Sequence, residues 1–175
     1  MHRKPVVAGQ FYPGSKDKWL EEVQRYLTGG EPGGAPATLS MVPHAGYPFS
    51  GGIAGRTLAR ARPGGRVLLL GPNHTGQGKP LSVWSAGTWE LPGVSVPVDE
   101  DLAAQILRAH KALQEDQVAH VREHSLEVVV PFLYALDEAT RIVPVAVAET
   151  DPDTLLQVGE ALAEVVSAQS EPVSV

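Results

Sequence analysis

The sequence contains no cysteine, and only 6 % of its residues are aromatic. A chain without cysteine has neither a disulfide framework nor thiolate chemistry. A reducing cytoplasm is the simplest compartment for such a protein. The charge balance is acidic, with 14 basic and 20 acidic residues and a net charge of −6. This balance disfavours nucleic-acid binding, because phosphate backbones are recognised by basic surfaces.

Long apolar runs are also lacking. No segment approaches the roughly 18 consecutive apolar residues that suggest a membrane span. Residues 1–5 do not have the apolar stretch of a signal peptide. Hydrophobic residues make up 43 % of the 175 positions, which is enough for a real core. We therefore expect one globular, cytoplasmic domain over residues 1–175, with no membrane partner.

Apolar periodicity predicts alternating helices and strands. Helices are expected over 16–27, 51–62, 99–109, 124–137 and 152–167, strands over 38–42, 66–70 and 141–147, short strands within 81–98, and a loop over 28–36. Pro131 indicates a kink or break, and Pro144 an edge strand or bulge. Residues 172–175 are typical of the start of a further strand. The alternation favours an α/β fold with helices layered on a sheet.

Two histidines follow predicted buried strands. His44 comes after 38–42 and His74 after 66–70. In open α/β sheets, ligands bind in the crevice outside the strand ends, so both imidazoles are expected in one cleft. Histidine is the commonest metal ligand and titrates near neutral pH. The alternative is that each histidine merely caps a strand end or bonds a loop.

Residues 120–124 read His-Val-Arg-Glu-His. This matches the H-x-x-E-H pattern of zinc peptidases, in which two histidines on one helical face bind zinc and the glutamate is the base. A zinc site needs a third protein ligand, and nothing in the sequence marks one. We therefore expect His120 to face solvent and only His124 to enter a pocket.

Glu123, His124 and Glu127 form a second group of interest. A carboxylate beside an imidazole fixes its tautomer and raises its basicity, so His124 with Glu123 is a candidate acid–base pair. The same three residues also suit the start of a helix, where acidic side chains favour the helix dipole. The local pattern leaves both interpretations open.

Four ordered motifs together resemble the Memo family, also called AmmeMemoRadiSam system protein B. They are Ala-Gly-Gln-Phe-Tyr-Pro-Gly at 8–14, Pro-His-Ala-Gly-Tyr at 43–47, Leu-Gly-Pro-Asn-His-Thr-Gly at 70–76 and Glu-His-Ser-Leu-Glu at 123–127. The resemblance implies a layered α/β/α fold with a mostly parallel or mixed sheet, similar to class III extradiol dioxygenases.

The resemblance also implies roles for individual residues. His44 and His74 correspond to metal ligands, with Fe(II) or Cu as the expected metal, and His124 corresponds to the catalytic histidine. Glu123, from its place beside that imidazole, is the second catalytic candidate. The pocket is expected to be lined by Phe11, Tyr47, Phe49, Asn73 and Glu127. The implied function is metal-dependent redox or dioxygenase-like chemistry. The alternatives are non-catalytic binding of a peptide or small ligand in the same pocket and, third, the zinc peptidase.

Memo chains usually continue for roughly another hundred residues, including a third pocket ligand. We therefore expect this chain to lack the family's C-terminal third, to expose a strand edge and an apolar helix face, and to bind metal weakly alone. The sheet would then be closed by a further segment or by a second copy in a homo-oligomer.

Overall fold

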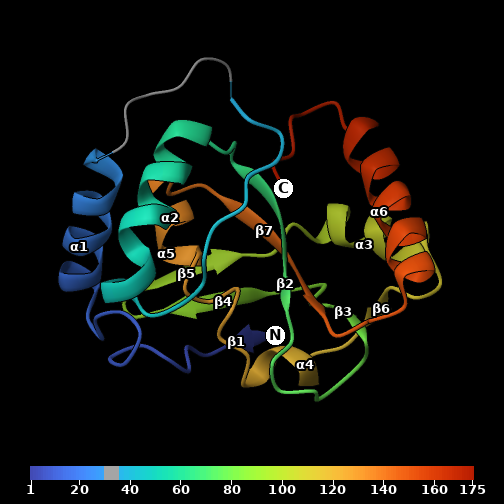
Figure 1. Cartoon of the computed structure of the whole chain (residues 1–175), viewed down its shortest axis with the longest axis horizontal. Coiled ribbons are helices and arrows are strands. Elements are labelled where there is room, and N and C mark those ends of the chain that lie inside the picture. Colours follow the sequence, from blue (N-terminus) through green and yellow to red (C-terminus); the bar gives the residue numbers. More distant parts are fainter. Residues whose placement is uncertain (30–35) are drawn as a thin grey trace.

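The computed structural model describes residues 1–29 and 36–175. The loop predicted over 28–36 therefore falls largely outside the described residues. The described part forms a mixed α/β fold with two sheets flanked by helices, as Figure 1 shows. The α/β class expected from the sequence is confirmed.

The larger sheet has the strand order β2-β7-β3-β6. Its strands are β2 (Arg66–Pro72), β7 (Arg141–Val147), β3 (Leu81–Val83) and β6 (Gln114–Glu115). β2 and β7 run parallel in unbroken register, from Arg66 opposite Arg141 to Pro72 opposite Val147. β3 is antiparallel to β7 and parallel to β6. This mixed sheet sets where the β2 strand ends, and hence where His74 lies.

The smaller sheet has the order β1-β4-β5. It consists of β1 (His2–Arg3), β4 (Thr88–Leu91) and β5 (Val94–Pro97). β1 pairs in parallel with β4, and β4 pairs antiparallel with β5. The first residues of the chain are thereby fixed in a sheet, which brings the following segment towards the functional site.

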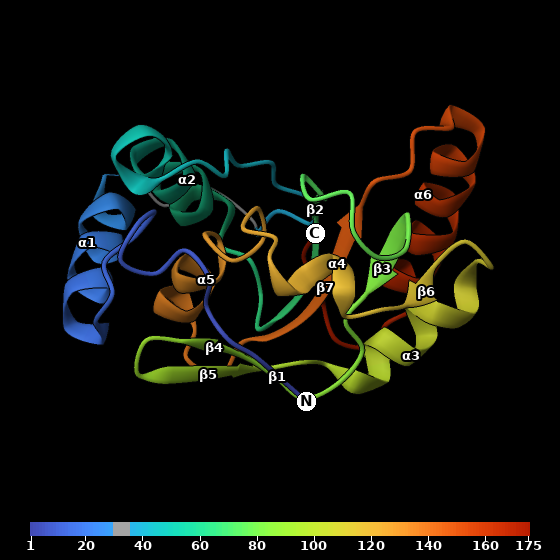
Figure 2. The same cartoon turned by 90° about the horizontal axis from the view of Figure 1, so that it is seen from below.

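The helices gather in two groups on either side of the sheets (Figures 1 and 2). α1 (Lys16–Thr28), α2 (Tyr47–Ala61) and α5 (Val130–Leu136) pack together, and α3 (Glu100–Ala109) packs against α6 (Pro152–Ser167). α4 (Val118–Val121) is a single short turn. None of the helices in the described residues is long and apolar enough to cross a bilayer.

The helices predicted over 16–27, 99–109 and 152–167 are confirmed to within a residue. Two of them begin at acidic caps. Asp99 accepts from the Leu102 amide at 3.1 Å, and Asp151 accepts from the Thr154 amide at 3.0 Å. Such caps satisfy amides that have no partner inside the helix.

The helix predicted over 124–137 is wrong in its first half. Residues 125–129 form turns, and α5 begins only at Val130. Pro131 stands in the first helical turn, where a missing N–H costs nothing, so the proline starts the helix and does not kink it. His124 therefore lies on an irregular segment. The helix predicted over 51–62 begins earlier, at Tyr47.

The strand predicted over 38–42 is also wrong. These residues belong to neither sheet, and the side chains of Leu39 and Met41 are 70 % and 86 % exposed. Their backbone pairs instead with the last residue, because Val175 donates to the Thr38 carbonyl and accepts from the Ser40 amide. The short apolar run therefore predicted a buried strand where the chain forms an exposed segment outside both sheets.

Two further expectations about strands are corrected. β7 is an interior strand, although Pro144 suggested an edge or bulge. The Pro144 carbonyl accepts from the Trp84 amide, so the proline nitrogen faces the side where β3 has already ended, at Val83. The segment 172–175, expected to start a strand without a neighbour, does have one, because Ser174 forms a parallel bridge with Val67 of β2.

Candidate functional site: a histidine pocket beyond strand β2

Three histidines from distant parts of the sequence converge beyond the end of β2. His44 precedes α2, His74 follows β2 and His124 lies before α5. The ring centres are 5.3 Å apart for His44 and His74, 4.9 Å for His74 and His124, and 6.3 Å for His44 and His124. The three imidazoles therefore share one cleft, although only His74 extends from a sheet strand.

Close packing brings residues 123–126 onto the end of β2. A Cβ atom added to Gly71 would lie 2.5 Å from Leu126 Cδ2, so only glycine fits without displacing that side chain. The Ser125 hydroxyl donates to the Pro72 carbonyl at 2.8 Å. These contacts place His124 beside His74, with their rings nearly parallel at 16°.

Glu123 is the buried centre of the cluster, with 1 % of its side chain exposed. Its carboxylate accepts from the His74 amide, from His74 Nδ1 at 3.0 Å, and from the amides of His124 and Ser125 at 2.8 and 2.9 Å. Burial opposes ionisation, yet the hydrogen bonds from His74, Ser125 and His124 outweigh it and bring the pKa of Glu123 to about 2. Glu123 is thus ionised at neutral pH.

The bond from His74 Nδ1 to Glu123 fixes the ring. Because a carboxylate only accepts, His74 carries its proton on Nδ1 and leaves the Nε2 lone pair free. Burial lowers the pKa of His44, and the facing imidazoles of His74 and His124 lower it further. Neutral imidazole is the form that binds metals.

This cluster contains three side chains whose spacing would allow them to hold a metal ion. The donor atoms of His74, Glu123 and His124 lie within 4.8 Å of one another, among the residues that the structure describes. Glu123 already accepts four N–H donors, which leaves it little capacity for a metal. His44 lies just outside this compact group, and its ring offers the next imidazole nitrogen.

The sequence of the whole chain resembles known proteins. The family model described as Memo-like protein matches residues 3–175. A MEMO1 family protein of Thermotoga maritima is 37 % identical over 181 residues, covering 95 % of this chain and 65 % of the relative. One of Methanopyrus kandleri is 41 % identical over 178 residues, covering 94 % and 63 %.

This chain belongs to the Memo family. A third relative, from Thermotoga neapolitana, is 39 % identical over 166 residues and is covered over 60 % of its length. The chain thus spans less than two thirds of the length of these Memo relatives.

A hollow of about 650 Å³ opens beside His44 and His124, whereas His74 is not among its lining residues. Two aromatic residues border it. The Phe11 ring meets His124 edge-on at 4.9 Å, and Phe49 is 85 % exposed at the rim. The other lining residues are Gln10, Pro43, His44, Ala45, Gly46, Pro48 and His124.

Three residues expected to line the pocket lie elsewhere. Tyr47 is buried, and its hydroxyl donates to the Val128 carbonyl at 3.1 Å. Asn73 shapes the turn after β2, because its Oδ1 accepts from Thr75 and its Nδ2 donates to the Gln77 carbonyl.

Glu127, the third, holds the N-terminal segment. Its carboxylate accepts from Arg3 Nη1 at 2.8 Å, from the amides of Val6 and Val7, and from the Tyr12 hydroxyl. Arg3 and Glu127 each have 1 % of the side chain exposed. This ion pair fixes the chain leading to Phe11. An N-terminal arginine is usually solvated, so nothing in the sequence marked Arg3 as buried.

The expectation that His120 faces solvent is wrong. His120 is fully buried in α4, where its Nε2 donates to the Ser82 carbonyl at 3.0 Å. Its ring lies edge-on to Trp84 and Trp89, with centres 6.0 and 5.8 Å away. His120 and His124 therefore do not share a helical face, and the paired arrangement that a H-x-x-E-H zinc peptidase requires is not formed.

Proposed function

We propose that His44, His74 and His124 bind one Fe(II) or Cu ion, and that this centre performs redox or dioxygenase-like chemistry. The observation that carries the proposal is the convergence of the three rings, with centres 4.9 to 6.3 Å apart. Imidazole is a common ligand of both metals. The Memo relatives supply the family but not the reaction.

The spacing of the rings fits a shared ion. With a metal–nitrogen bond of about 2.1 Å, two imidazoles on one ion have centres roughly 5 Å apart. The pairs that include His74 meet this value, and His44 needs to approach His124 by about 1 Å. This approach is small for a residue on a loop. The fit therefore requires a side-chain adjustment and no rearrangement of the fold.

The chain's own residues would prepare the site. Glu123 holds the His74 ring through Nδ1, so that Nε2 is presented, and outer carboxylates of this kind strengthen metal ligands. Phe11 packs on His124 and covers one side of its ring. A bound Fe(II) or Cu ion would supply the electron transfer. The open side, towards Phe49, is where a substrate would enter.

Metal titration tests this proposal. The purified chain is stripped with a chelator and titrated with Fe(II) without oxygen, and separately with Cu. We expect one weakly bound ion per chain, and at least tenfold weaker binding after His44→Ala, His74→Ala or His124→Ala. His2→Ala is the control, because that histidine has 72 % of its side chain exposed and lies outside the pocket. Binding that none of the three pocket variants weakens would refute the site.

A second candidate function is binding of a peptide in the same hollow without chemistry. Phe49 favours it, because an aromatic ring exposed to 85 % beside a polar cluster is typical of a recognition surface. A display library of short peptides would test this function. Binding that survives metal removal and is lost after Phe49→Ala would favour recognition over chemistry.

A further inference from the structure

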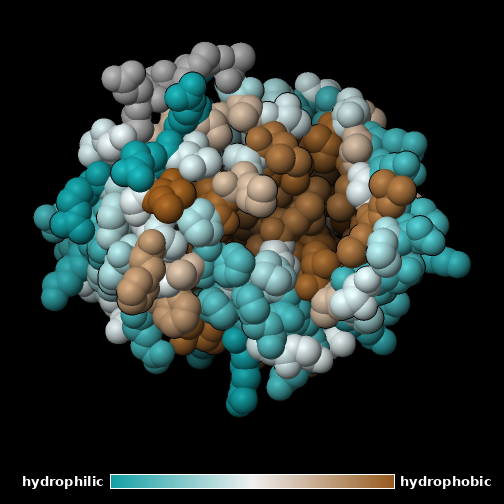
Figure 3. All heavy atoms as spheres, in the orientation of Figure 1, coloured by the Kyte–Doolittle hydropathy of each residue, from teal (hydrophilic) through white to brown (hydrophobic). Residues whose placement is uncertain are grey.

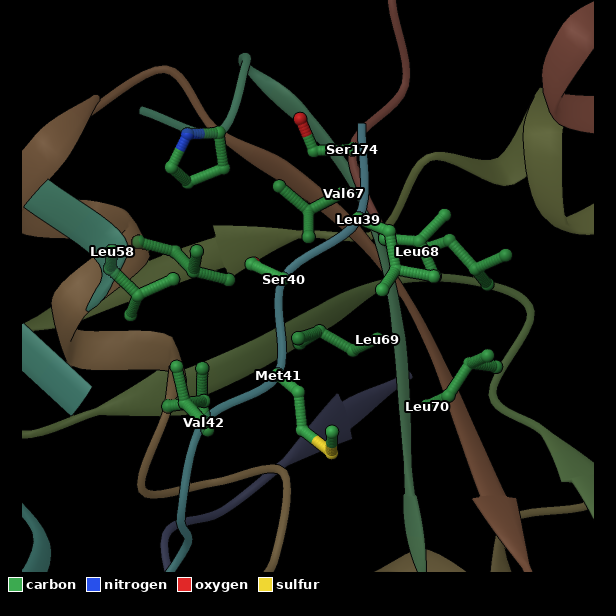
Figure 4. Close-up of a pocket in the computed structure, with 14 residues that line it drawn as sticks. Leu39, Ser40, Met41, Val42, Leu58, Val67, Leu68, Leu69, Leu70 and Ser174 are labelled. Carbon is green, nitrogen blue, oxygen red and sulfur yellow. The ribbon is translucent and has the colours of Figure 1, made fainter. Parts of the chain in front are cut away.

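Two regions outside the histidine pocket differ sharply in polarity. One is an apolar depression beside β2, which is brown in Figure 3 and whose lining side chains are drawn in Figure 4. Among the described residues that line it, none has an ionisable side chain. The other region is buried and charged, and it surrounds the guanidinium of Arg3, which has 1 % of its side chain exposed. A buried charge is tolerated only where it is paired and hydrogen-bonded, so the partners of Arg3 indicate what it does.

The guanidinium of Arg3 binds mainly to one segment of the chain. Its Nε donates to the His120 carbonyl at 3.0 Å, and its Nη2 donates to the Glu123 carbonyl. Its Nη1 donates to the Glu127 carboxylate at 2.8 Å and to the Lys4 carbonyl at 3.3 Å. Three of these four acceptors lie on the segment that leads into α5. One side chain therefore holds three points of the segment that supplies an imidazole to the pocket.

Arg3 is itself held in place by the smaller sheet. It lies opposite Trp89 in the parallel pairing of β1 with β4. Its Cζ atom lies 4.2 Å from the centre of the Trp89 ring, a distance typical of a cation–π contact. Neither contact involves residues 120–127. The guanidinium is thus a fixed support against which that segment packs.

The peptide unit between Glu123 and His124 shows the consequence most directly. Its carbonyl oxygen accepts from Arg3 Nη2, and its N–H donates to the Glu123 carboxylate at 2.8 Å. The same carboxylate accepts from His74 Nδ1. Within the described part of the chain, no backbone amide donates to this carbonyl, and residues 122–129 belong to no helix or strand. The orientation of this peptide unit therefore depends on side chains, and Arg3 binds its outer edge.

We propose that Arg3 is a positioning residue of the candidate metal centre. By holding this peptide unit, it directs the Glu123 carboxylate towards His74 and the His124 ring into the pocket. Arg3 acts through these residues, because its own side chain is not among the described residues that line the pocket. The inference rests on the proposed function, since it assigns Arg3 a role in metal affinity. Arginine suits this role because its planar fork donates to several acceptors in fixed directions, whereas a lysine ammonium is a point charge.

The test compares Arg3→Lys with Arg66→Lys, two variants that keep the positive charge. Arg66 is a matched control, because it is also a largely buried arginine, with 12 % of its side chain exposed, and it pairs with the Asp99 carboxylate at 2.7 Å. It does not line the histidine pocket. The whole chain is titrated with Fe(II) without oxygen. We expect at least tenfold weaker binding for Arg3→Lys and less than a twofold change for Arg66→Lys.

A second measurement needs no metal. The Nδ1 proton of His74, which bonds to Glu123, is followed by hydrogen exchange in NMR spectra of the metal-free chain. We expect exchange at least tenfold faster in Arg3→Lys than in wild type or Arg66→Lys. Circular dichroism and urea unfolding show that both variants are folded and how much stability each has lost. A general loss of stability would affect both variants, whereas a loss of position affects Arg3→Lys alone.

Equal effects of the two variants, or wild-type affinity and exchange in Arg3→Lys, would overturn the proposal, because Arg3 would then support only the fold. If the wild-type chain binds no Fe(II), the proposed function fails, and the exchange comparison alone decides the role of Arg3. If Arg3→Lys does not fold, Trp89→Phe replaces it, because this variant keeps Arg3 and reduces the ring that supports it. Unchanged exchange in Trp89→Phe would then refute the positioning role.

Discussion

Glu123 and Glu127 lie four residues apart and are equally buried, yet they hold different parts of the molecule. Glu123 accepts from His74, His124 and Ser125, and so belongs to the histidine pocket. Glu127 accepts from Arg3, Tyr12 and the Val6 and Val7 amides, and so belongs to the N-terminal segment. One carboxylate positions a candidate site, and the other fixes the fold around it.

The two histidines of the 120–124 segment, His120 and His124, also lie in different surroundings. His124 reaches the pocket, whereas His120 is enclosed by Trp84, Trp89 and the Ser82 carbonyl. The H-x-x-E-H sequence thus contributes one histidine and the glutamate to the pocket, and the other histidine to the core. Adjacent residues with similar chemistry acquire different roles because the backbone between α4 and α5 is irregular.

The largest expected effect concerns Glu127. Glu127→Gln leaves Arg3 buried without a counter-charge, and breaking a buried ion pair costs about 3–5 kcal/mol. Urea unfolding followed by circular dichroism measures this loss. Glu160→Gln, on the exposed face of α6, should change the free energy of unfolding by less than about 0.5 kcal/mol. Equal effects of the two variants would contradict a structural role of Glu127.

The next largest effect is a dependence of stability on pH that arises from His120. Burial lowers the pKa of His120 to about 4, from about 6.5 in the unfolded chain. Between these values the unfolded chain takes up a proton that the folded chain does not, so stability falls as pH falls. The full loss of stability is at most about 3.4 kcal/mol, because each pKa unit corresponds to about 1.36 kcal/mol.

His120→Gln keeps an N–H donor for Ser82 and removes the titration. The lowered pKa of His44 acts in the same direction, so the difference between wild type and variant isolates His120. Urea unfolding at pH 7 and pH 5 should show a smaller loss in the variant. An identical loss would mean that His120 does not titrate with folding. Metal binding at pH 7 should be unchanged, because the ring does not enter the pocket.

A smaller effect, on metal binding, is expected from Glu123. Glu123→Gln removes the charge that holds His74 Nδ1, and loss of such an outer carboxylate weakens metal binding about 10–100-fold. Titration with Fe(II) or Cu measures this, with Glu160→Gln as control. If affinity stays within twofold of wild type, Glu123 does not position the ligand.

Glu123 also makes a pH prediction of its own. Its pKa is about 2 in the folded chain and about 4.3 when unfolded. The ionised Glu123 therefore contributes its full stabilisation above about pH 4.3, its pKa in the unfolded chain, and this stabilisation is lost as pH falls towards 2. This window lies below that of His120, so unfolding curves between pH 4.5 and pH 2 separate the two groups.

Much of the fold could be predicted from sequence because its signals are local. Asp151 with Pro152 predicted the start of α6, and the apolar run 141–147 predicted β7 to the residue. The secondary-structure predictions were wrong where tertiary contacts determine the local structure. The short apolar run at 38–42 lies on the surface, and Pro144 is tolerated inside the sheet because the neighbouring strand β3 ends beside it.

The candidate site was predictable in part. His44, His74 and His124 were singled out by position and family resemblance, and the structure places their rings together. The partners of Glu127 were not predictable, because Arg3 lies 124 residues away and no local pattern records that contact. His120 was misplaced for a related reason, since its enclosure depends on Trp84 and Trp89 from another part of the chain.

The smallest effect on stability is expected at Phe49, an exposed residue at the rim of the pocket. Its ring is 85 % exposed, so Phe49→Ala removes almost no buried surface and should change the free energy of unfolding by less than about 0.5 kcal/mol. Phe11→Ala should cost more, because that ring packs edge-on against His124 at 4.9 Å and such contacts contribute about 0.5–1.5 kcal/mol beyond burial. Thermal unfolding of both variants measures the difference. A larger loss of stability for Phe49→Ala than for Phe11→Ala would mean that the Phe49 ring packs in the core. The distinction between residues that line the pocket and residues that stabilise the fold would then not hold.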